Sequence, residues 1–252
     1  GSLLTCLRQA GTNGIPRKDA ALMAVARVRQ GRFFTFEGID GCGKTTQLNL
    51  FADYLRRRKL PVVITREPGG TPLGEAVRKI LLRGKSHSID PHTELLLMFA
   101  SRAQNVAQVI APALAQGKNV LCDRFTDASL AYQGYGRGLD RRFIGALHRF
   151  ACRSLKPDLT FVLDIAPHTS LQRARRRLRE SCRDEGRFEQ ETLAFHARVR
   201  RGYLELARRE PRRIRRLNGE DTIENIHQKI VALARPWLRP YGRGSPRLRK
   251  RS

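Results

Sequence analysis

A glycine-rich segment between a β-rich run and a helix-like stretch limits the possible folds of this chain more strongly than any other part of its sequence. It reads Gly38-Ile39-Asp40-Gly41-Cys42-Gly43-Lys44-Thr45 and matches the pattern G-x-x-x-x-G-K-[ST]. The run Phe33-Phe34-Thr35-Phe36 precedes it. Residues 44–58 follow it with apolar side chains at 48, 51 and 55, which is helical spacing. This context predicts a strand, a loop that wraps around phosphate groups, and a helix.

Each residue type in this loop has a physical reason. Glycines let the backbone turn its N–H groups toward a phosphate chain, and a helix that begins at Lys44 points its positive end at the same anion. Lys44 adds a cation near the β- and γ-phosphates, and the Thr45 hydroxyl can hold Mg²⁺. A plain glycine-rich turn is the alternative, but it would not need a strand before it and a helix after it. We therefore expect a nucleotide-binding loop made of Gly38, Ile39, Asp40, Gly41, Cys42, Gly43, Lys44, Thr45 and Thr46.

Strand-like and helix-like segments alternate along the rest of the chain. Strands are predicted at 61–65, 119–123, 159–164 and 214–218, and helices at 72–82, about 92–116 and about 222–235. The strand segments have short, continuous apolar cores, which suit a parallel sheet that is covered on both faces. The sequence thus predicts an α/β fold with a doubly wound sheet.

The formal net charge of +26, from 49 Lys+Arg and 23 Asp+Glu, invites a nucleic-acid-binding function. Nearly half of this excess lies at the two ends, with a net +5 in residues 1–32 and a net +7 in residues 234–252. We expect residues 1–31 to be a disordered N-terminal extension and 237–252 a disordered basic tail, with one domain at 32–236. Such a tail could add weak, nonspecific, salt-sensitive binding of nucleic acid.

Composition and patterning exclude several other classes of protein. No run of 18 or more apolar residues occurs, so we expect no membrane-spanning helix and no membrane partner. The N-terminus lacks the pattern of a secretory signal. Five cysteines stand far apart without a C-x-x-C pair, which indicates reduced thiols in a cytoplasmic protein rather than disulfides or a zinc site.

Four motifs in order give the sequence a clear resemblance to a known family. They are residues 36–46 (FEGIDGCGKTT), residues 65–71 (TREPGGT), residues 123–134 (DRFTDASLAYQG) and residues 187–191 (RFEQE). Together they resemble the bacterial thymidylate (dTMP) kinases, a family of P-loop nucleoside monophosphate kinases, over about residues 32–235. The resemblance implies a three-layer α/β/α fold with a five-stranded parallel sheet and a short helical lid at about 173–189. It also implies transfer of the γ-phosphoryl group of ATP to dTMP with Mg²⁺, giving dTDP for dTTP biosynthesis, and usually a homodimer.

The resemblance also implies roles for the charged residues. Lys44 would hold the phosphates of the donor, with Thr45 and, through water, Asp123 serving the metal. Arg124 follows a strand at its carboxyl end, where open α/β sheets bind ligands, and would bridge the donor and acceptor phosphates. A structural ion pair is the alternative role for Arg124. Arg78 resembles the arginine that grips the dTMP phosphate, although a solvated arginine on a helix is the alternative, and Arg66 has a similar claim.

A second set resembles the residues that recognise the nucleoside. Asp40 would meet the 3′-hydroxyl of the acceptor sugar, and Tyr132 would crowd the 2′ position in favour of deoxyribose. Arg102, Ser129 and Gln133 resemble the set that reads thymine. Many relatives carry a Phe four residues before this arginine, to stack on the base; here that position is Met98, with Phe99 next to it. The thioether of Met98 can cover a ring face, although stacking would be weaker or supplied differently.

The charge that closes over the phosphates is expected to come from the lid. Some relatives carry an Arg in the glycine-rich loop, where this chain has Gly41. Relatives without it supply a lid arginine, which would act as an internal arginine finger. Arg177 and Arg187 are the candidates among the seven arginines of residues 173–187. Two alternatives to a dTMP kinase stay open: another P-loop (deoxy)nucleoside monophosphate kinase, and a nucleic-acid-binding P-loop protein.

Overall fold

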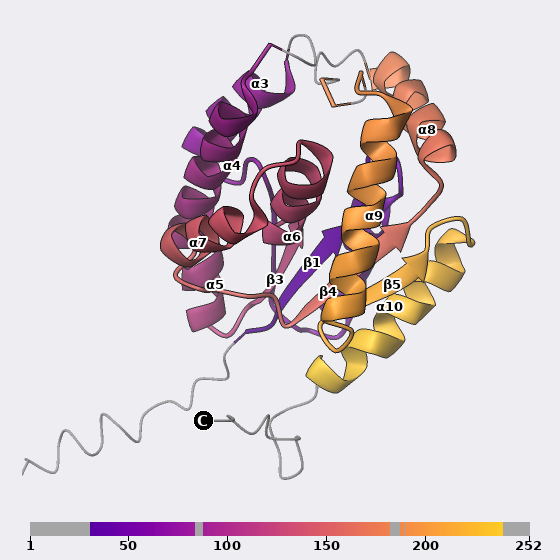
Figure 1. The fold of residues 1–252 in the computed structure, drawn as a ribbon. Coiled ribbons are helices and arrows are strands. Elements are labelled where there is room, and N and C mark those ends of the chain that lie inside the picture. Colours follow the sequence, from indigo (N-terminus) through magenta and orange to yellow (C-terminus); the bar gives the residue numbers. More distant parts are fainter. Residues whose placement is uncertain (1–30, 84–87, 182–186, 189, 239–252) are drawn as a thin grey trace, which may run out of the picture.

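The computed structural model describes residues 31–83, 88–181, 187, 188 and 190–238 (Figure 1). The predicted N-terminal extension and basic tail lie outside the described residues, apart from Gly31, Trp237 and Leu238. Of these, Trp237 and Leu238 belong to the last helix, which ends two residues beyond the predicted end of the domain. The guanidinium carbon of Arg32 lies 5.5 Å from the centre of the Trp237 ring, so this helix end packs beside the start of the domain.

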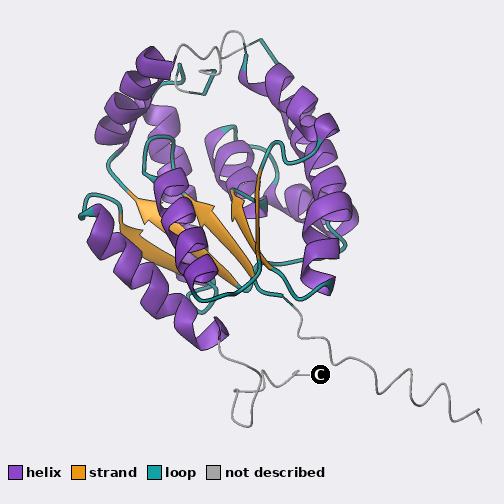
Figure 2. Ribbon diagram, turned by 180° about the vertical axis from the view of Figure 1, so that it is seen from behind, coloured by secondary structure: helices purple, strands orange, loops and turns teal. Residues whose placement is uncertain are grey.

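Five parallel strands form one sheet in the order β2-β3-β1-β4-β5. They are β1 (Phe33–Glu37), β2 (Val62–Arg66), β3 (Asn119–Asp123), β4 (Leu159–Asp164) and β5 (Ile214–Asn218). Helices cover both faces of the sheet, as Figures 1 and 2 show from opposite sides. The predicted three-layer α/β/α fold with five parallel strands is confirmed.

The helical segments are α2 (Lys44–Arg57), α3 (Pro72–Leu82), α4 (Pro91–Asn105), η1 (Val106–Ile110), α5 (Ala111–Ala115), α6 (Thr126–Ser129), η2 (Leu130–Gly136), α7 (Arg141–Ala151), α8 (Pro167–Ser181), α9 (Leu193–Arg209) and α10 (Ile223–Leu238). Side chains at their first turns fix several starts. Thr71 accepts a hydrogen bond from the Gly74 N–H at the start of α3, and Asp90 accepts from the His92 N–H at the start of α4. Both helices also begin with a proline, whose missing N–H costs nothing at that position.

The single helix predicted at about 92–116 is wrong in one respect. The segment starts as α4, widens into the π-helical stretch η1 and continues as α5. Pro112 explains the change, because proline has no N–H to donate and its ring clashes with the carbonyl four residues earlier in a regular α-helix. A wider turn before Pro112 lets the chain continue in the same direction.

Aromatic side chains fill the core between the sheet and α2. Phe34 and Phe36 of β1, Phe51 of α2 and Phe161 of β4 are all fully buried. Their ring centres lie 5.2–6.4 Å apart, mostly in tilted or edge-to-face arrangements. This cluster anchors β1 and α2 on either side of the glycine-rich loop, so it holds the loop between two rigid elements.

Replacing Phe161 by Ala should lower the free energy of unfolding by about 3–5 kcal/mol, because the ring leaves a cavity among three other rings. Urea denaturation monitored by circular dichroism measures this loss. Leu193→Ala is the control, since Leu193 at the start of α9 is 52% exposed and its removal should change stability little. Equal losses for the two variants would contradict this account of the core.

Candidate active site

The loop after β1 is closed so tightly that two of its glycines cannot be replaced without moving it. Gly38 has a φ of +134° and Gly41 a φ of +83°. A Cβ on Gly38 would lie 2.6 Å from the carbonyl oxygen of Leu163, and one on Gly41 would lie 2.3 Å from that of Ser170. The loop therefore packs directly on the backbone of β4 and α8, which only glycine permits.

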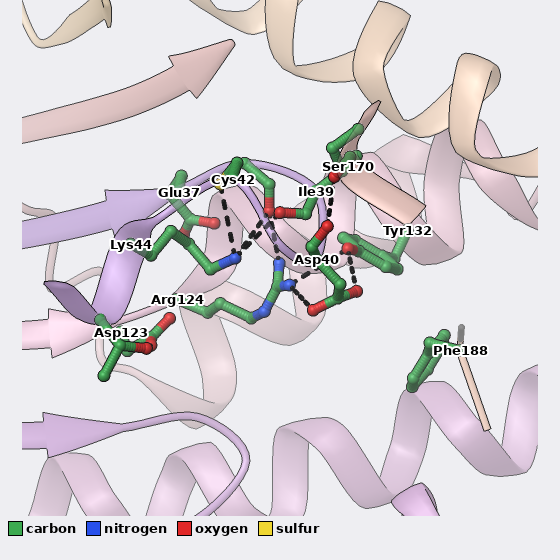
Figure 3. Close-up of polar contacts among 12 residues, drawn as sticks. Glu37, Ile39, Asp40, Cys42, Lys44, Asp123, Arg124, Tyr132, Ser170 and Phe188 are labelled. Carbon is green, nitrogen blue, oxygen red and sulfur yellow. Dashed lines mark hydrogen bonds and ion pairs between the residues drawn. The ribbon is translucent and has the colours of Figure 1, made fainter. Parts of the chain in front are cut away.

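Lys44 begins α2 and folds its side chain back over this loop (Figure 3). Its Nζ donates to the carbonyl oxygens of Gly38, at 3.2 Å, and of Ile39, at 3.1 Å, and lies 3.7 Å from the sulfur of Cys42. The residue is only 7% exposed. Its positive charge is thus held inside the curve of the loop and is largely shielded from water.

Thr45 and Asp123, the two predicted metal ligands, lie next to each other. The Thr45 hydroxyl donates to Asp123 Oδ2 at 3.0 Å, which joins the first turn of α2 to the end of β3. A hydroxyl and a carboxylate are oxygen ligands of the kind that Mg²⁺ prefers. Among the described residues, no group of three or more His, Cys, Asp or Glu side chains could hold a metal. This pair fits Mg²⁺ that is shared with the phosphates of a bound nucleotide.

Arg124 directly follows β3, and its guanidinium reaches back to the glycine-rich loop. Nη1 donates to the Gly38 carbonyl at 2.9 Å and to the Tyr203 hydroxyl at 3.2 Å. Nη2 donates to Asp40 Oδ1 at 2.5 Å and to the Tyr132 hydroxyl at 3.1 Å. The structure therefore brings Arg124 together with Asp40 and Tyr132, two residues that the sequence assigned to the same site.

Two carboxylates around Arg124 have pKa values moved in opposite directions. Burial opposes the ionisation of Asp40, but the charges of Arg124 and Lys44 and a hydrogen bond from Tyr132 outweigh it and hold its pKa well below the usual range. Burial raises the pKa of Glu37 to about 8, helped by the charge of Asp127 and opposed by that of Arg124. Asp40 is thus the anionic partner of the arginine.

A cleft of about 930 Å³ opens at the carboxyl ends of β1, β2 and β3. Parallel α/β sheets bind ligands at this edge. The predicted site residues that line the cleft are Asp40, Lys44, Thr45, Thr46, Arg66, Arg78, Met98, Arg102, Asp123, Arg124, Ser129, Tyr132 and Gln133. The cleft therefore gathers residues that are spread over more than 90 positions of the sequence.

The three predicted thymine-reading residues, Arg102, Ser129 and Gln133, all line the cleft. The buried Arg102 guanidinium bonds the Glu67 carboxylate, the Ser129 hydroxyl at 3.0 Å and the Phe125 carbonyl at 3.2 Å. Met98 is half-buried and lines the cleft, whereas Phe99 is buried behind it with the Arg102 guanidinium carbon 4.6 Å from its ring centre. Of the two, Met98 is therefore the residue that can cover a bound base.

Comparison with known proteins identifies the family. A sequence model described as thymidylate kinase matches residues 36–230. The chain is 51% identical to the thymidylate kinase of Pelobacter propionicus over 203 residues, which cover 80% of this chain and 93% of that protein. It is 53% identical to the thymidylate kinase of Geobacter sulfurreducens over 196 residues, which cover 77% and 92%. The chain belongs to the thymidylate kinase family.

The enzyme therefore phosphorylates dTMP. Its fold also matches the crystal structure of thymidylate kinase from Ehrlichia chaffeensis with a TM-score of 0.66 and 34% sequence identity, covering 81% of this chain and 98% of that one. Among the described residues, no helix is both long and apolar enough to cross a membrane.

The two candidate lid arginines of this thymidylate kinase have different surroundings. Arg177 lies in α8, and its side chain is outside the described part of the structure. Arg187 is fully buried, and its side chain donates to the Leu81 carbonyl at 2.5 Å and to Glu94 Oε2 at 2.5 Å. Arg187 does not line the cleft, so contact with a phosphate would require it to leave Glu94.

Sequence reasoning missed several residues that build the site of the enzyme. Glu94 is buried and accepts from Gln133 Nε2 at 2.8 Å, as well as from Arg137 and Arg187. Phe188 lines the cleft, with its ring centre 5.5 Å from that of Tyr132. Tyr203 comes from α9, which was not predicted as a helix although Phe195, Val199, Tyr203 and Leu206 have helical spacing. That spacing was the signal that could have found it.

The raised pKa of Glu37 predicts a pH dependence of stability that Glu37→Gln should remove. The folded protein holds a proton on Glu37 up to about pH 8, whereas an unfolded Glu loses it near its ordinary pKa of 4.5. The contribution of this proton to stability is complete below pH 4.5 and is lost as the pH rises to 8. Urea denaturation from pH 5 to 8 should show a steeper fall for the wild type than for Glu37→Gln. Parallel curves would contradict the shift.

Proposed function

We propose that the enzyme uses ATP with Mg²⁺ as the phosphoryl donor and converts dTMP to dTDP, supplying dTTP biosynthesis. The observation that carries the proposal is the position of the Arg124 guanidinium, bonded to Gly38 and Asp40 of the glycine-rich loop on one side and facing the cleft on the other. A single cation there can contact the donor and acceptor phosphates together. Phosphoryl transfer between two anions depends mostly on such charge compensation and alignment.

The donor half of the site would be the glycine-rich loop. Lys44 would exchange its two loop carbonyls for the β- and γ-phosphates of ATP, and the backbone N–H groups of the loop would bind the same chain. Thr45 and Asp123 would hold Mg²⁺, the latter through water. When bound, Mg²⁺ neutralises charge on the phosphates and orients them.

The acceptor half would be the wall between α3, α4 and η2. Arg78 lines the cleft and donates to the Pro68 carbonyl at 3.2 Å. Arg66, the last residue of β2, forms an ion pair with Glu75 of α3. We propose that Arg78 grips the dTMP phosphate, with Arg66 nearby. Arg102, Ser129 and Gln133 would read thymine, while Tyr132 would crowd the 2′ position and Asp40 would meet the 3′-hydroxyl.

Of the two candidate arginines of the lid, we propose Arg177 as the one that closes over the phosphates. Arg187 would have to leave a buried carboxylate and a carbonyl to do so, which is costly in a low-dielectric interior. Its present contacts suit a structural role in which Arg187 and Arg137 together neutralise Glu94.

We also propose that the enzyme forms a homodimer. Large apolar side chains are exposed on the neighbouring helices α3, α4 and α7: Leu73, Ile80, Leu96, Phe143 and Phe150. Exposed apolar side chains gathered on adjacent helices are a common sign of a protein interface. These five side chains lie outside the lining of the cleft, so a partner subunit seated on them would leave the proposed catalytic site open.

A coupled assay of ADP release with MgATP and dTMP, dUMP, dCMP, dGMP or AMP should show clear preference for dTMP. Lys44→Ala and Arg124→Ala should each lower kcat/KM for dTMP by about a hundredfold or more, because each removes a charge that faces the transferred group. Lys229→Ala is the control, since Lys229 pairs with Asp221 on the surface and should be replaceable.

Equal turnover of all five monophosphates would contradict dTMP as the substrate. It would favour the broader alternative, another nucleoside monophosphate kinase. Wild-type turnover by a folded Lys44→Ala or Arg124→Ala variant would refute the role of that residue.

Met98→Phe tests what covers the base. An aromatic ring at this position should stack on thymine more strongly than a thioether, by about 0.5–1.5 kcal/mol, which lowers KM for dTMP roughly two- to tenfold. Initial-rate measurements at saturating MgATP give KM directly, and Ile223→Phe is the control, since Ile223 at the start of α10 is exposed and lies outside the lining of the cleft. A raised KM for dTMP in Met98→Phe would mean that the base does not lie over this residue.

A further inference from the structure

Arg124 is held from both its backbone and its side chain by two residues with no role in the proposed reaction. We infer that Tyr203 and Glu37 are positioning residues, which fix the Arg124 guanidinium for phosphoryl transfer. The inference rests on the catalytic role proposed above for Arg124. Tyr203 acts through its hydroxyl group, and Glu37 acts through both oxygens of its carboxyl group.

The backbone at Arg124 needs such support because it is in an unfavourable conformation. Its φ of +70° lies in the left-handed region, which is unfavourable for a residue with a side chain. Two hydrogen bonds from β1 hold the turn on either side. The Arg124 N–H donates to the Phe36 carbonyl at 3.0 Å, and the Phe125 N–H donates to Glu37 Oε1 at 2.7 Å.

The carboxyl group of Glu37 also fixes the side chain of Arg124, through the hydroxyl group of Tyr203. Tyr203 donates its hydroxyl proton to Glu37 Oε2 at 2.8 Å and accepts from Arg124 Nη1 at 3.2 Å. The Gly38 carbonyl accepts from the same nitrogen. Nη1 is thus anchored by a carbonyl and an oriented hydroxyl, while Nη2 bonds Asp40 and Tyr132 at the surface of the cleft.

Burial makes this arrangement rigid. Tyr203 is 2% exposed and Glu37 is completely buried, so neither has water as an alternative partner. Tyr203 comes from α9 and Glu37 from the central strand β1, so the two residues connect the arginine to two separate elements of the domain. With Nη1 anchored, a phosphate that replaces Asp40 at Nη2 would meet a guanidinium whose direction is already set.

The test is a double-mutant cycle between Tyr203→Phe and Arg124→Lys in the ADP-release assay. Tyr203→Phe keeps the buried ring and removes only the hydroxyl. It should lower kcat about tenfold to a hundredfold with less than a threefold change in KM for dTMP and ATP, because a misdirected cation fails mainly in the transition state. In the Arg124→Lys background the same change should cost much less, since an ammonium group lacks Nη1.

Two further variants separate positioning from a general structural effect. Tyr54→Phe is the matched control, because Tyr54 packs on Phe51 in α2 and its hydroxyl has no hydrogen-bond partner among the described residues. It should leave kcat unchanged. Glu37→Leu fills a similar volume but has no oxygen to contact the Phe125 N–H or the Tyr203 hydroxyl, so it should lower kcat in the same direction as Tyr203→Phe.

The inference is overturned if Tyr203→Phe is folded and keeps kcat within twofold of the wild type, or if its loss is equally large with Arg124→Lys. It is also overturned if the loss appears only as a raised KM. Arg124→Ala, assayed in parallel, distinguishes a different failure. If Arg124→Ala itself retains wild-type turnover, the proposed role of Arg124 is wrong, whatever Tyr203 does.

Discussion

The ion pair between Arg124 and Asp40 organises the centre of this enzyme. It joins the end of β3 to the loop that follows β1, 84 positions away in the sequence, and Tyr132 contacts both partners of this partly buried pair. Burying a guanidinium without an anion would be strongly unfavourable, so the loop must place Asp40 where it does. The closed shape of the loop and the direction of the arginine therefore depend on each other. Because β3, β1 and β4 are parallel neighbours in the sheet, the ends of these strands bring the two partners together.

The sheet and the glycine-rich loop could be predicted from sequence because they depend on local pattern. Short apolar runs identified each strand to within one or two residues, and the spacing of the glycines and Lys44 was sufficient to identify the loop. The π-helical stretch before Pro112 was missed because proline signals a break but not how the chain continues. Helix α9 was missed because its apolar positions Phe195, Val199 and Tyr203 are separated by several arginines, which make the segment resemble a charged surface stretch.

The residues that line the cleft could be predicted where a family motif includes them, but the partners of the buried arginines could not. Arg102 and Ser129 were expected to face a base, but nothing in the sequence indicated that Glu67 would bind the same guanidinium. Likewise Arg187 was one of two candidates for the lid arginine, and nothing in the sequence indicated that it would pair with Glu94 inside the protein. Partner choice among many arginines and few carboxylates depends on three-dimensional distance, and a chain with 49 basic and 23 acidic residues offers too many pairings for sequence spacing to select one.

The inward fold of Lys44 has a consequence for how binding energy is divided. A lysine on an exposed loop would lose its bound water when a phosphate bound. The free energy of that dehydration would weaken the affinity for the phosphate. Here the ammonium group already contacts two backbone carbonyls in place of most of its water. The free energy of removing that water is therefore part of the folding free energy. A phosphate bound there as proposed would replace these carbonyls by oxygens of higher charge and would have little water left to remove from the ammonium group. More of the attraction between the lysine and the phosphate would then contribute to affinity for the nucleotide.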